Sequence, residues 1–192
     1  MMKKWWFVAM LFAPLALAAP RVQMETNHGN IVIELAPKQA PQTVKNFLRY
    51  VADGSYDGSV FHRVIRNFVV QGGGYNQQFQ QLPTFEPVIN ESKGGLPNKR
   101  GTIAMARTQA VDSATRQFYF NLVDNNNLNA SGGAGYTVFG EVVQGMNVLD
   151  KLAQVQTSYS SILRAKDVPT SPIILKKVVL LADSTAEKKT TP

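Results

Sequence analysis

The sequence contains no cysteine and only two histidines, His28 and His62, among its 192 residues. Without cysteine the chain has no disulfide, no thiol chemistry and no thiolate metal ligand. Two histidines give little support for a zinc site, because such sites are built from clusters of histidine, cysteine and carboxylate side chains. We therefore expect a protein that needs no metal and no other cofactor.

Charged residues are also few, at 17% of the chain, although the formal net charge is +7 at pH 7. The basic residues are scattered, and no lysine- or arginine-rich run occurs. A nucleic-acid-binding surface needs basic residues gathered on one face or along one helix. The sequence therefore predicts no nucleic-acid partner. An envelope protein that binds anionic partners through its net charge remains a weaker alternative.

A long apolar stretch occurs only at the N-terminus, where two lysines precede the uncharged residues Trp5–Leu17. An Ala-Leu-Ala sequence then ends at Ala18, and this small-x-small pattern is typical of a signal peptidase site. The stretch is short for a membrane span, which takes about 20 apolar residues. We expect residues 1–18 to be a bacterial signal peptide rather than an uncleaved anchor. The predicted location is the periplasm, or alternatively the medium, without stable membrane insertion.

Common catalytic motifs are missing as well. Ser113 follows an aspartate but has no G-x-S-x-G context, and a catalytic triad would have to use His62. The three glycines at 72–74 lack the Lys-Ser/Thr of a phosphate-binding loop, and no evident helix follows them. Triad hydrolysis and nucleotide binding are therefore poorly supported.

The rest of the chain alternates short apolar segments with glycine-rich connections, and it predicts eight strands and two helices. The expected strands cover residues 22–26, 31–35, 60–65, 68–71, 101–107, 117–122, 136–143 and 173–181, and the expected helices cover 40–53 and 146–154. Closing the sheet would remove its exposed edges. We expect a mainly β fold, a closed eight-stranded antiparallel barrel with two helices capping its ends. It forms one domain over residues 19–183, followed by a polar, disordered tail at 184–192.

Residues 61–74 read F-H-R-V-I-R-N-F-V-V-Q-G-G-G. This segment closely resembles the F-H-R-V-I-x-x-F-x-x-Q-G-G signature of cyclophilins, and further similar segments follow in order at 100–107, 112–120 and 136–142. The resemblance runs over nearly the whole mature chain and is greatest to periplasmic bacterial members. It implies a peptidyl-prolyl cis-trans isomerase that assists the folding of exported proteins. Its implied partners are proline-containing unfolded or exported polypeptides, and we expect a monomer.

The resemblance also implies site residues. Arg63 matches the arginine that donates a hydrogen bond near the prolyl nitrogen as the bond twists, a task suited to a permanently charged guanidinium. Phe68 and Gln71 complete the predicted catalytic set. The predicted substrate-binding residues are the pocket walls Val69, Tyr119 and Leu128, the backbone-binding Gln117, the substrate-facing strand residues Ala106 and Arg107, and Tyr136 at the rim.

Some positions depart from the family pattern. Tyr119 stands where phenylalanine is usual, Asn127 where eukaryotic members have tryptophan, and Arg116 where a small residue is usual. The changes at Tyr119 and Asn127 keep open an alternative function, a cyclophilin-like barrel that binds proline segments as a chaperone with little turnover. We expect the side chain of Arg107 to matter little, and we expect His62 to be a buried, hydrogen-bonded structural residue.

Overall fold

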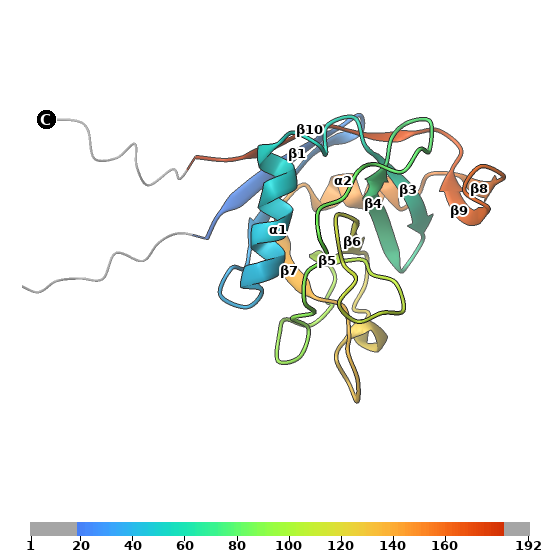
Figure 1. The fold of residues 1–192 in the computed structure, drawn as a ribbon. Coiled ribbons are helices and arrows are strands. Elements are labelled where there is room, and N and C mark those ends of the chain that lie inside the picture. Colours follow the sequence, from blue (N-terminus) through green and yellow to red (C-terminus); the bar gives the residue numbers. More distant parts are fainter. Residues whose placement is uncertain (1–18, 183–192) are drawn as a thin grey trace, which may run out of the picture.

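The computed structural model describes residues 19–182 (Figure 1). The predicted signal peptide and the predicted tail lie outside these residues. Eight of the ten strands in the described part close into an antiparallel barrel, in the order β1-β10-β3-β4-β6-β5-β7-β2. The other two, β8 (Thr157–Ser160) and β9 (Ala165–Pro169), form a separate two-stranded sheet. The predicted fold class is confirmed.

The elements of the barrel agree with the sequence analysis in number and kind. The strands are β1 (Arg21–Thr26), β2 (Gly29–Leu35), β3 (Val60–Ile65), β4 (Val69–Tyr75), β5 (Thr102–Met105), β6 (Phe118–Asn121), β7 (Val138–Gln144) and β10 (Ile173–Leu180). The helices are α1 (Pro41–Ala52) and α2 (Met146–Leu152), with a short 3-10 helix, η1 (Asn126–Leu128). Helix η1 and the β8–β9 hairpin were not predicted from the sequence.

Helix α1 covers part of the barrel with one apolar face. Pro41 occupies the first turn, where a missing N–H costs no hydrogen bond. Val44, Phe47 and Val51 follow at helical spacing and are buried in the main core. The ring of Phe47 lies 5.1 Å from that of Phe139 on β7, measured between centroids. This contact joins the helix to the interior of the barrel.

Strand β4 differs most from its prediction, because it continues through the three glycines to Tyr75 instead of ending at Gln71. The reason is close packing. At Gly73, where φ is +83°, a Cβ atom would lie 2.8 Å from the ring of Phe118 and 2.9 Å from that of Tyr56. At Gly74 it would lie 2.6 Å from the side chain of Gln117. The glycines are therefore strand residues that allow other side chains to approach the backbone.

The barrel closes between the two ends of the described chain. Val22 on β1 pairs with Leu180 on β10, and the backbone N–H of Leu181 donates to the carbonyl of Arg21 at 2.8 Å. Both ends therefore leave the domain on one side, and the β8–β9 hairpin lies on the opposite side in Figure 1.

Candidate active site

A row of five residues crosses adjacent strands on the outer wall of the barrel. Arg63 on β3 pairs with Gln71 on β4, which pairs with Tyr119 on β6. Tyr119 pairs in turn with Ala104 on β5, and Ala104 with Val138 on β7. Each of these five residues has at least one sequence neighbour in the main core, and side chains alternate between the two faces of a strand. The row therefore faces outward.

The apolar half of this row belongs to a cluster that is separate from the main core. Val69, Ala104, Tyr119 and Val138 are its buried members. Phe68, Leu96, Ala106, Leu128 and Tyr136 are half-buried and pack against them. All the apolar residues that the sequence predicted to bind the substrate are thus brought together in one cluster, which we call the outer-wall cluster.

The polar half is a chain of hydrogen bonds that begins at the predicted catalytic arginine. Arg63 donates through Nη1 to Oε1 of Gln71 at 3.2 Å. Gln71 donates through Nε2 to Oε1 of Gln117 at 2.9 Å. This chain fixes the orientation of both amides and holds one edge of the guanidinium. The structure therefore brings Arg63, Gln71 and Gln117 together beside the outer-wall cluster.

Two hollows meet at the Gln71–Gln117 pair. One, of about 180 Å³, is lined also by Gln81, Ala106, Arg107, Thr108, Ser113 and Thr115. The other, of about 390 Å³, contains Arg63 and is lined also by His62, Tyr75, Leu163, Ala165, Lys166 and Asp167. An extended peptide that crosses the row would therefore have space on both sides of the two glutamines.

His62 is buried, with 7% of its surface exposed, and its ring packs edge-on against Tyr75 at 4.7 Å between centroids. Burial, helped by the positive charge of Arg63, lowers the pKa of His62 to about 4. The imidazole is consequently neutral at physiological pH. The expectation of a fully hydrogen-bonded imidazole is wrong, because Nδ1 has no hydrogen-bond partner within residues 19–182.

Ala106 and Arg107 lie beyond the end of β5, although the predicted strand included them. The N–H of Ala106 donates to the carbonyl of Gln117 at 2.9 Å, so that group is used within the protein. The side chain of Arg107 donates to the carbonyls of Ala134 and Gly135 and lies 4.7 Å from the ring centroid of Tyr136. Contrary to the expectation, this side chain has a structural task, because it holds the loop before β7.

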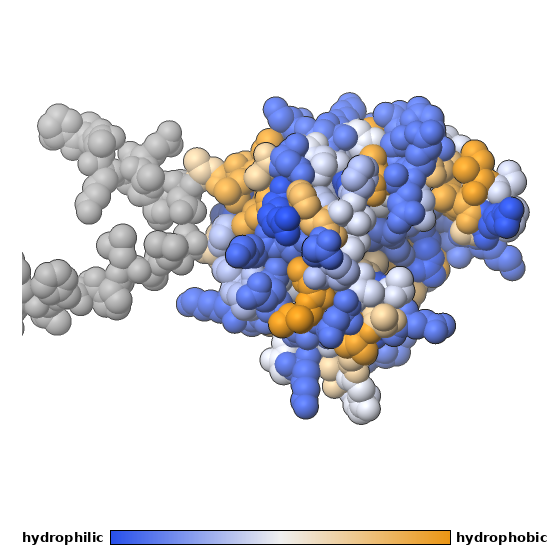
Figure 2. Space-filling view, in the orientation of Figure 1, coloured by the Kyte–Doolittle hydropathy of each residue, from blue (hydrophilic) through white to orange (hydrophobic). Residues whose placement is uncertain are grey.

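The β8–β9 hairpin, which was not predicted from the sequence, supplies Leu163, Lys166 and Asp167 to the hollow beside Arg63. Its connection contains no glycine. Instead, Arg164 in the connection and Asp167 within β9 adopt positive φ angles of 49° and 65°, respectively. The available signal was weak: a short Thr-Ser-Tyr-Ser run and a later Val168. Apolar side chains gather over this hairpin in Figure 2, where Ile162 is 68% exposed.

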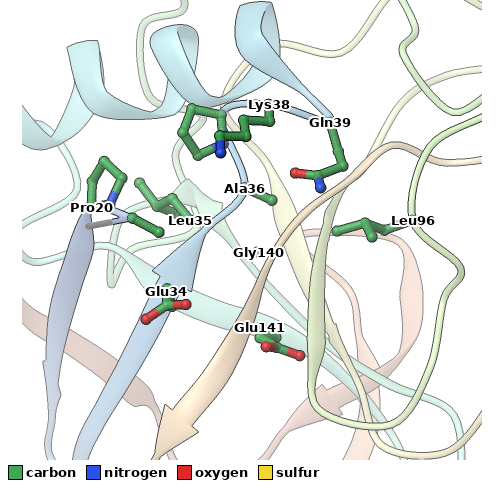
Figure 3. Close-up of a pocket in the computed structure, with 11 residues that line it drawn as sticks. Pro20, Glu34, Leu35, Ala36, Lys38, Gln39, Leu96, Gly140 and Glu141 are labelled. Atoms are coloured by element: carbon green, nitrogen blue, oxygen red, sulfur yellow. The ribbon is translucent and has the colours of Figure 1, made fainter. Parts of the chain in front are cut away.

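A hollow larger than the two beside the glutamines lies elsewhere. It has a volume of about 670 Å³ and lies beside Pro20, Leu35, Leu96 and Gly140 (Figure 3). None of the predicted site residues lines it. Residues 19–182 also contain no group of three or more His, Cys, Asp or Glu side chains that could hold a metal ion. The predicted site residues therefore lie at the outer-wall cluster and not at this larger hollow.

Comparison with known proteins gives a consistent result. The family profile described as "Cyclophilin type peptidyl-prolyl cis-trans isomerase/CLD" matches residues 21–180. A peptidyl-prolyl cis-trans isomerase of Acinetobacter baylyi is 48% identical over 93% of this chain and 94% of its own length. Peptidyl-prolyl cis-trans isomerase B of Escherichia coli is 50% identical over 83% of this chain and 98% of its own.

Solved structures agree. A cyclophilin-type isomerase of Cryptosporidium parvum, crystallised in the presence of the dipeptide Ala-Pro, aligns with a TM-score of 0.67 and 26% identity. The alignment covers 85% of this chain and 99% of that one.

Proposed function

Because the chain belongs to the cyclophilin-type peptidyl-prolyl cis-trans isomerases, which accelerate rotation about the bond before proline, we propose that Arg63 is the group that acts on that bond. Resonance between the prolyl nitrogen and the carbonyl gives this rotation a barrier of about 18–20 kcal/mol. As the bond twists, the nitrogen lone pair is no longer delocalised and becomes a hydrogen-bond acceptor. A guanidinium that donates to it stabilises the twisted state more than the planar one, and this difference is catalysis.

The outer-wall cluster is the proposed proline slot. Phe68, Val69, Tyr119 and Leu128 present an apolar surface that holds the ring while the carbonyl on the other side of the bond rotates. Gln71 and Gln117 line the hollows on both sides and are suited to bind the substrate backbone. Ala106, Arg107 and Tyr136 complete the wall and rim. The dipeptide Ala-Pro used with the Cryptosporidium relative is the smallest peptide that contains an Xaa-Pro bond.

The observation that carries this proposal is the junction of Arg63 with Gln71, beside the outer-wall cluster. No other arginine of the described chain combines a half-exposed side chain, a hydrogen bond to a predicted site glutamine and a place next to that cluster. A donor with one edge already held needs little reorganisation when the transition state forms.

The test compares Arg63→Ala and Arg63→Lys with Arg66→Ala, an exposed arginine three residues further along the chain. We expect both Arg63 variants to fold and to lose about 10²–10³ in kcat/KM on a short Xaa-Pro peptide, because a pre-aimed donor is removed or loses its planar fork. Arg66→Ala should retain wild-type turnover. Wild-type turnover in folded Arg63→Ala protein would overturn the proposal.

We further propose that the protein is exported and acts as a monomer on unfolded, proline-containing polypeptides in the periplasm, or alternatively in the medium. The basic, apolar and Ala-Leu-Ala segments of residues 1–18 support cleavage after Ala18. No helix in residues 19–182 is long and apolar enough to cross a membrane. N-terminal sequencing of protein purified from its native cells should begin at Ala19. An intact Met1, or recovery with membranes after a high-salt wash, would contradict export by cleavage.

A further inference from the structure

Arg116 is the largest side chain that is fully buried in the described chain, with 1% of its surface exposed. Neither of the two ion pairs formed by the described residues includes it. A buried guanidinium is costly unless hydrogen bonds replace those that it made with water. Burial accordingly lowers the pKa of Arg116 from its ordinary value. An arginine that remains buried at this cost needs an explanation.

Three backbone carbonyls from separate segments replace the missing water. Arg116 donates through Nε to Gly73 on β4, through Nη1 to Pro83 in the following loop, and through Nη2 to Ser55 after α1, each at 2.6 Å. Its Cζ atom lies 5.0 Å from the ring centroid of Tyr50. The planar fork of arginine can reach three acceptors in fixed directions, which a lysine ammonium cannot do in the same way. Arg116 is thus the junction of three chain segments.

This junction lies one residue before Gln117 in its own segment and two residues after Gln71 on β4. Arg116 directly precedes Gln117, and Gly73, which holds its Nε, directly precedes Gly74. A Cβ atom at Gly74 would lie 2.6 Å from Cγ, Cδ and Nε2 of Gln117, so that side chain packs directly on the Gly74 backbone. Two consecutive residues of one segment therefore dock on two consecutive residues of β4.

The backbone of Arg116 is held as firmly as its side chain. Its carbonyl accepts a hydrogen bond from the hydroxyl of Tyr56 at 2.7 Å, and Tyr56 is itself fully buried. Gln117 therefore starts from a fixed backbone position and lies against a fixed surface. Its Oε1 then accepts from Gln71, whose Oε1 accepts from Arg63.

We propose that Arg116 is a positioning residue for the isomerisation: it fixes Gln117 against β4, and through Gln117 and Gln71 it aims the guanidinium of Arg63. The inference rests on the proposed role of Arg63. A positioning role and a purely structural role of Arg116 predict different kinetic results. A residue that serves only stability lowers the free energy of unfolding when it is replaced, but it leaves kcat of the folded protein unchanged. A positioning residue that is replaced leaves a folded protein with a poorly aimed donor.

The test measures kcat and KM separately, by exchange NMR on a short Xaa-Pro peptide, for Arg116→Met and Arg116→Lys below their melting transitions. We expect Arg116→Met to lower kcat about tenfold with KM within about twofold, because a small misplacement of the donor affects the transition state more than the bound substrate. Arg116→Lys should restore part of the loss, because an ammonium can still donate to some of the carbonyls.

Two controls distinguish an effect on the position of the Arg63 side chain from an effect on the stability of the fold. Val178→Ala, in the main core on β10, should lower the melting temperature without lowering kcat. The double variant Arg116→Met with Gln117→Leu should have the same kcat as Gln117→Leu alone, because both changes break one chain of contacts. If the two losses multiply instead, or if Val178→Ala lowers kcat as much as Arg116→Met, the inference is wrong.

The outcome is distinguishable from a failure of the proposed function. Inactive Arg63→Ala with fully active Arg116→Met would overturn only this inference, whereas active Arg63→Ala would overturn the role of Arg63 itself. Should Arg116→Met fail to fold, Tyr56→Phe is the milder variant, since it removes only the hydrogen bond to the Arg116 carbonyl. A fall in its kcat at constant KM supports the inference, and wild-type kcat contradicts it.

Discussion

The hydroxyl group of Tyr119 donates a hydrogen bond to Oδ1 of Asn98 at 2.8 Å, and both residues are buried. Asn98 donates in turn through Nδ2 to the carbonyls of Leu128 and Tyr136. The tyrosine hydroxyl, which is unusual for the family at this position, is therefore used to connect the floor of the proposed slot to the loop that forms its rim. It has a partner beneath the slot, so one reason for considering a binding protein with little turnover loses weight.

We predict that Tyr119→Phe keeps kcat/KM within about threefold of wild type. Oδ1 of Asn98 still accepts from Asn121, so the variant leaves no unpaired acceptor and should cost about 1 kcal/mol of unfolding free energy. Denaturant unfolding and the isomerisation assay check both values. A loss of activity beyond tenfold in folded protein would show that the hydroxyl acts on the substrate.

We predict that Gly74→Ala lowers activity while the fold is retained. The new methyl group would meet Gln117 at 2.6 Å, and a flexible side chain can move away, which breaks its hydrogen bond with Gln71. We expect kcat to fall about tenfold, as for other small misplacements of a catalytic donor. Gly133→Ala is the matched control, because a Cβ atom there has no neighbour within 4 Å. Equal activity of the two variants would contradict the need for the Gln71–Gln117 contact.

We predict a nearly flat pH profile of kcat/KM between about pH 6 and 8.5. The pKa of His62 is lowered to about 4 and burial raises the pKa of Tyr119, so neither residue titrates in this range, while arginine stays charged. Stopped-flow or NMR rates across the range provide the measurement. A bell-shaped profile that disappears in His62→Gln would instead reveal general acid–base catalysis.

We predict that His62 lowers the stability of the protein in acid. Its pKa is about 4 in the folded protein against an ordinary 6.5, so the unfolded chain binds more protons between these values. Stability is therefore unaffected by His62 above about pH 6.5 and falls as the pH is lowered towards 4, by about 3 kcal/mol in all. Unfolding curves of wild type and His62→Gln at pH 7.5, 5.5 and 4 should diverge by this amount. Parallel curves would contradict the prediction.

We predict weak inhibition by cyclosporin, the cyclic peptide that inhibits many members of this family. Asn127 is exposed on η1 at the position where eukaryotic members have a tryptophan that lines the drug site. Loss of an aromatic anchor commonly costs about 2 kcal/mol, or about thirtyfold in affinity. Asn127→Trp should tighten inhibition about tenfold or more and change turnover less, while Asn126→Trp, its exposed neighbour, should not. Tight inhibition of the wild type would show that another residue supplies the contact.

Local patterns were sufficient for most of the fold. Alternating apolar residues predicted the barrel strands, and the apolar stripe from Val44 to Val51 predicted α1. Both patterns arise because one face of a strand or helix is buried. The β8–β9 hairpin was missed since Arg164 and Asp167 adopt backbone angles at which glycine or asparagine is the usual signal. The length of β4 was missed because the reason for its glycines lies in side chains that belong to other strands.

Only the site residues that belong to a family motif could be predicted from the sequence. Residues such as Arg63, Gln71 and Tyr119 came from the resemblance, and strand register then explains why they are neighbours. The connections beneath them were not predictable. The carbonyls that bind Arg116 lie 33 to 61 residues away in sequence, and Asn98 reaches Tyr119 across 21 residues. Such contacts leave no periodic pattern in the sequence, because each depends on how segments far apart in sequence are placed in the fold.

The pairing of β1 with β10 means that the described chain starts and ends on neighbouring strands, with paired Cα atoms about 5 Å apart. A short peptide could join these ends, and the exposed loop at Gly132 and Gly133 could supply new ones, so the barrel is suited to circular permutation. For the same reason it could be inserted into a surface loop of another protein without separating the two sides of that loop. The closure of the sheet, rather than the position of the first residue, then defines the folding unit.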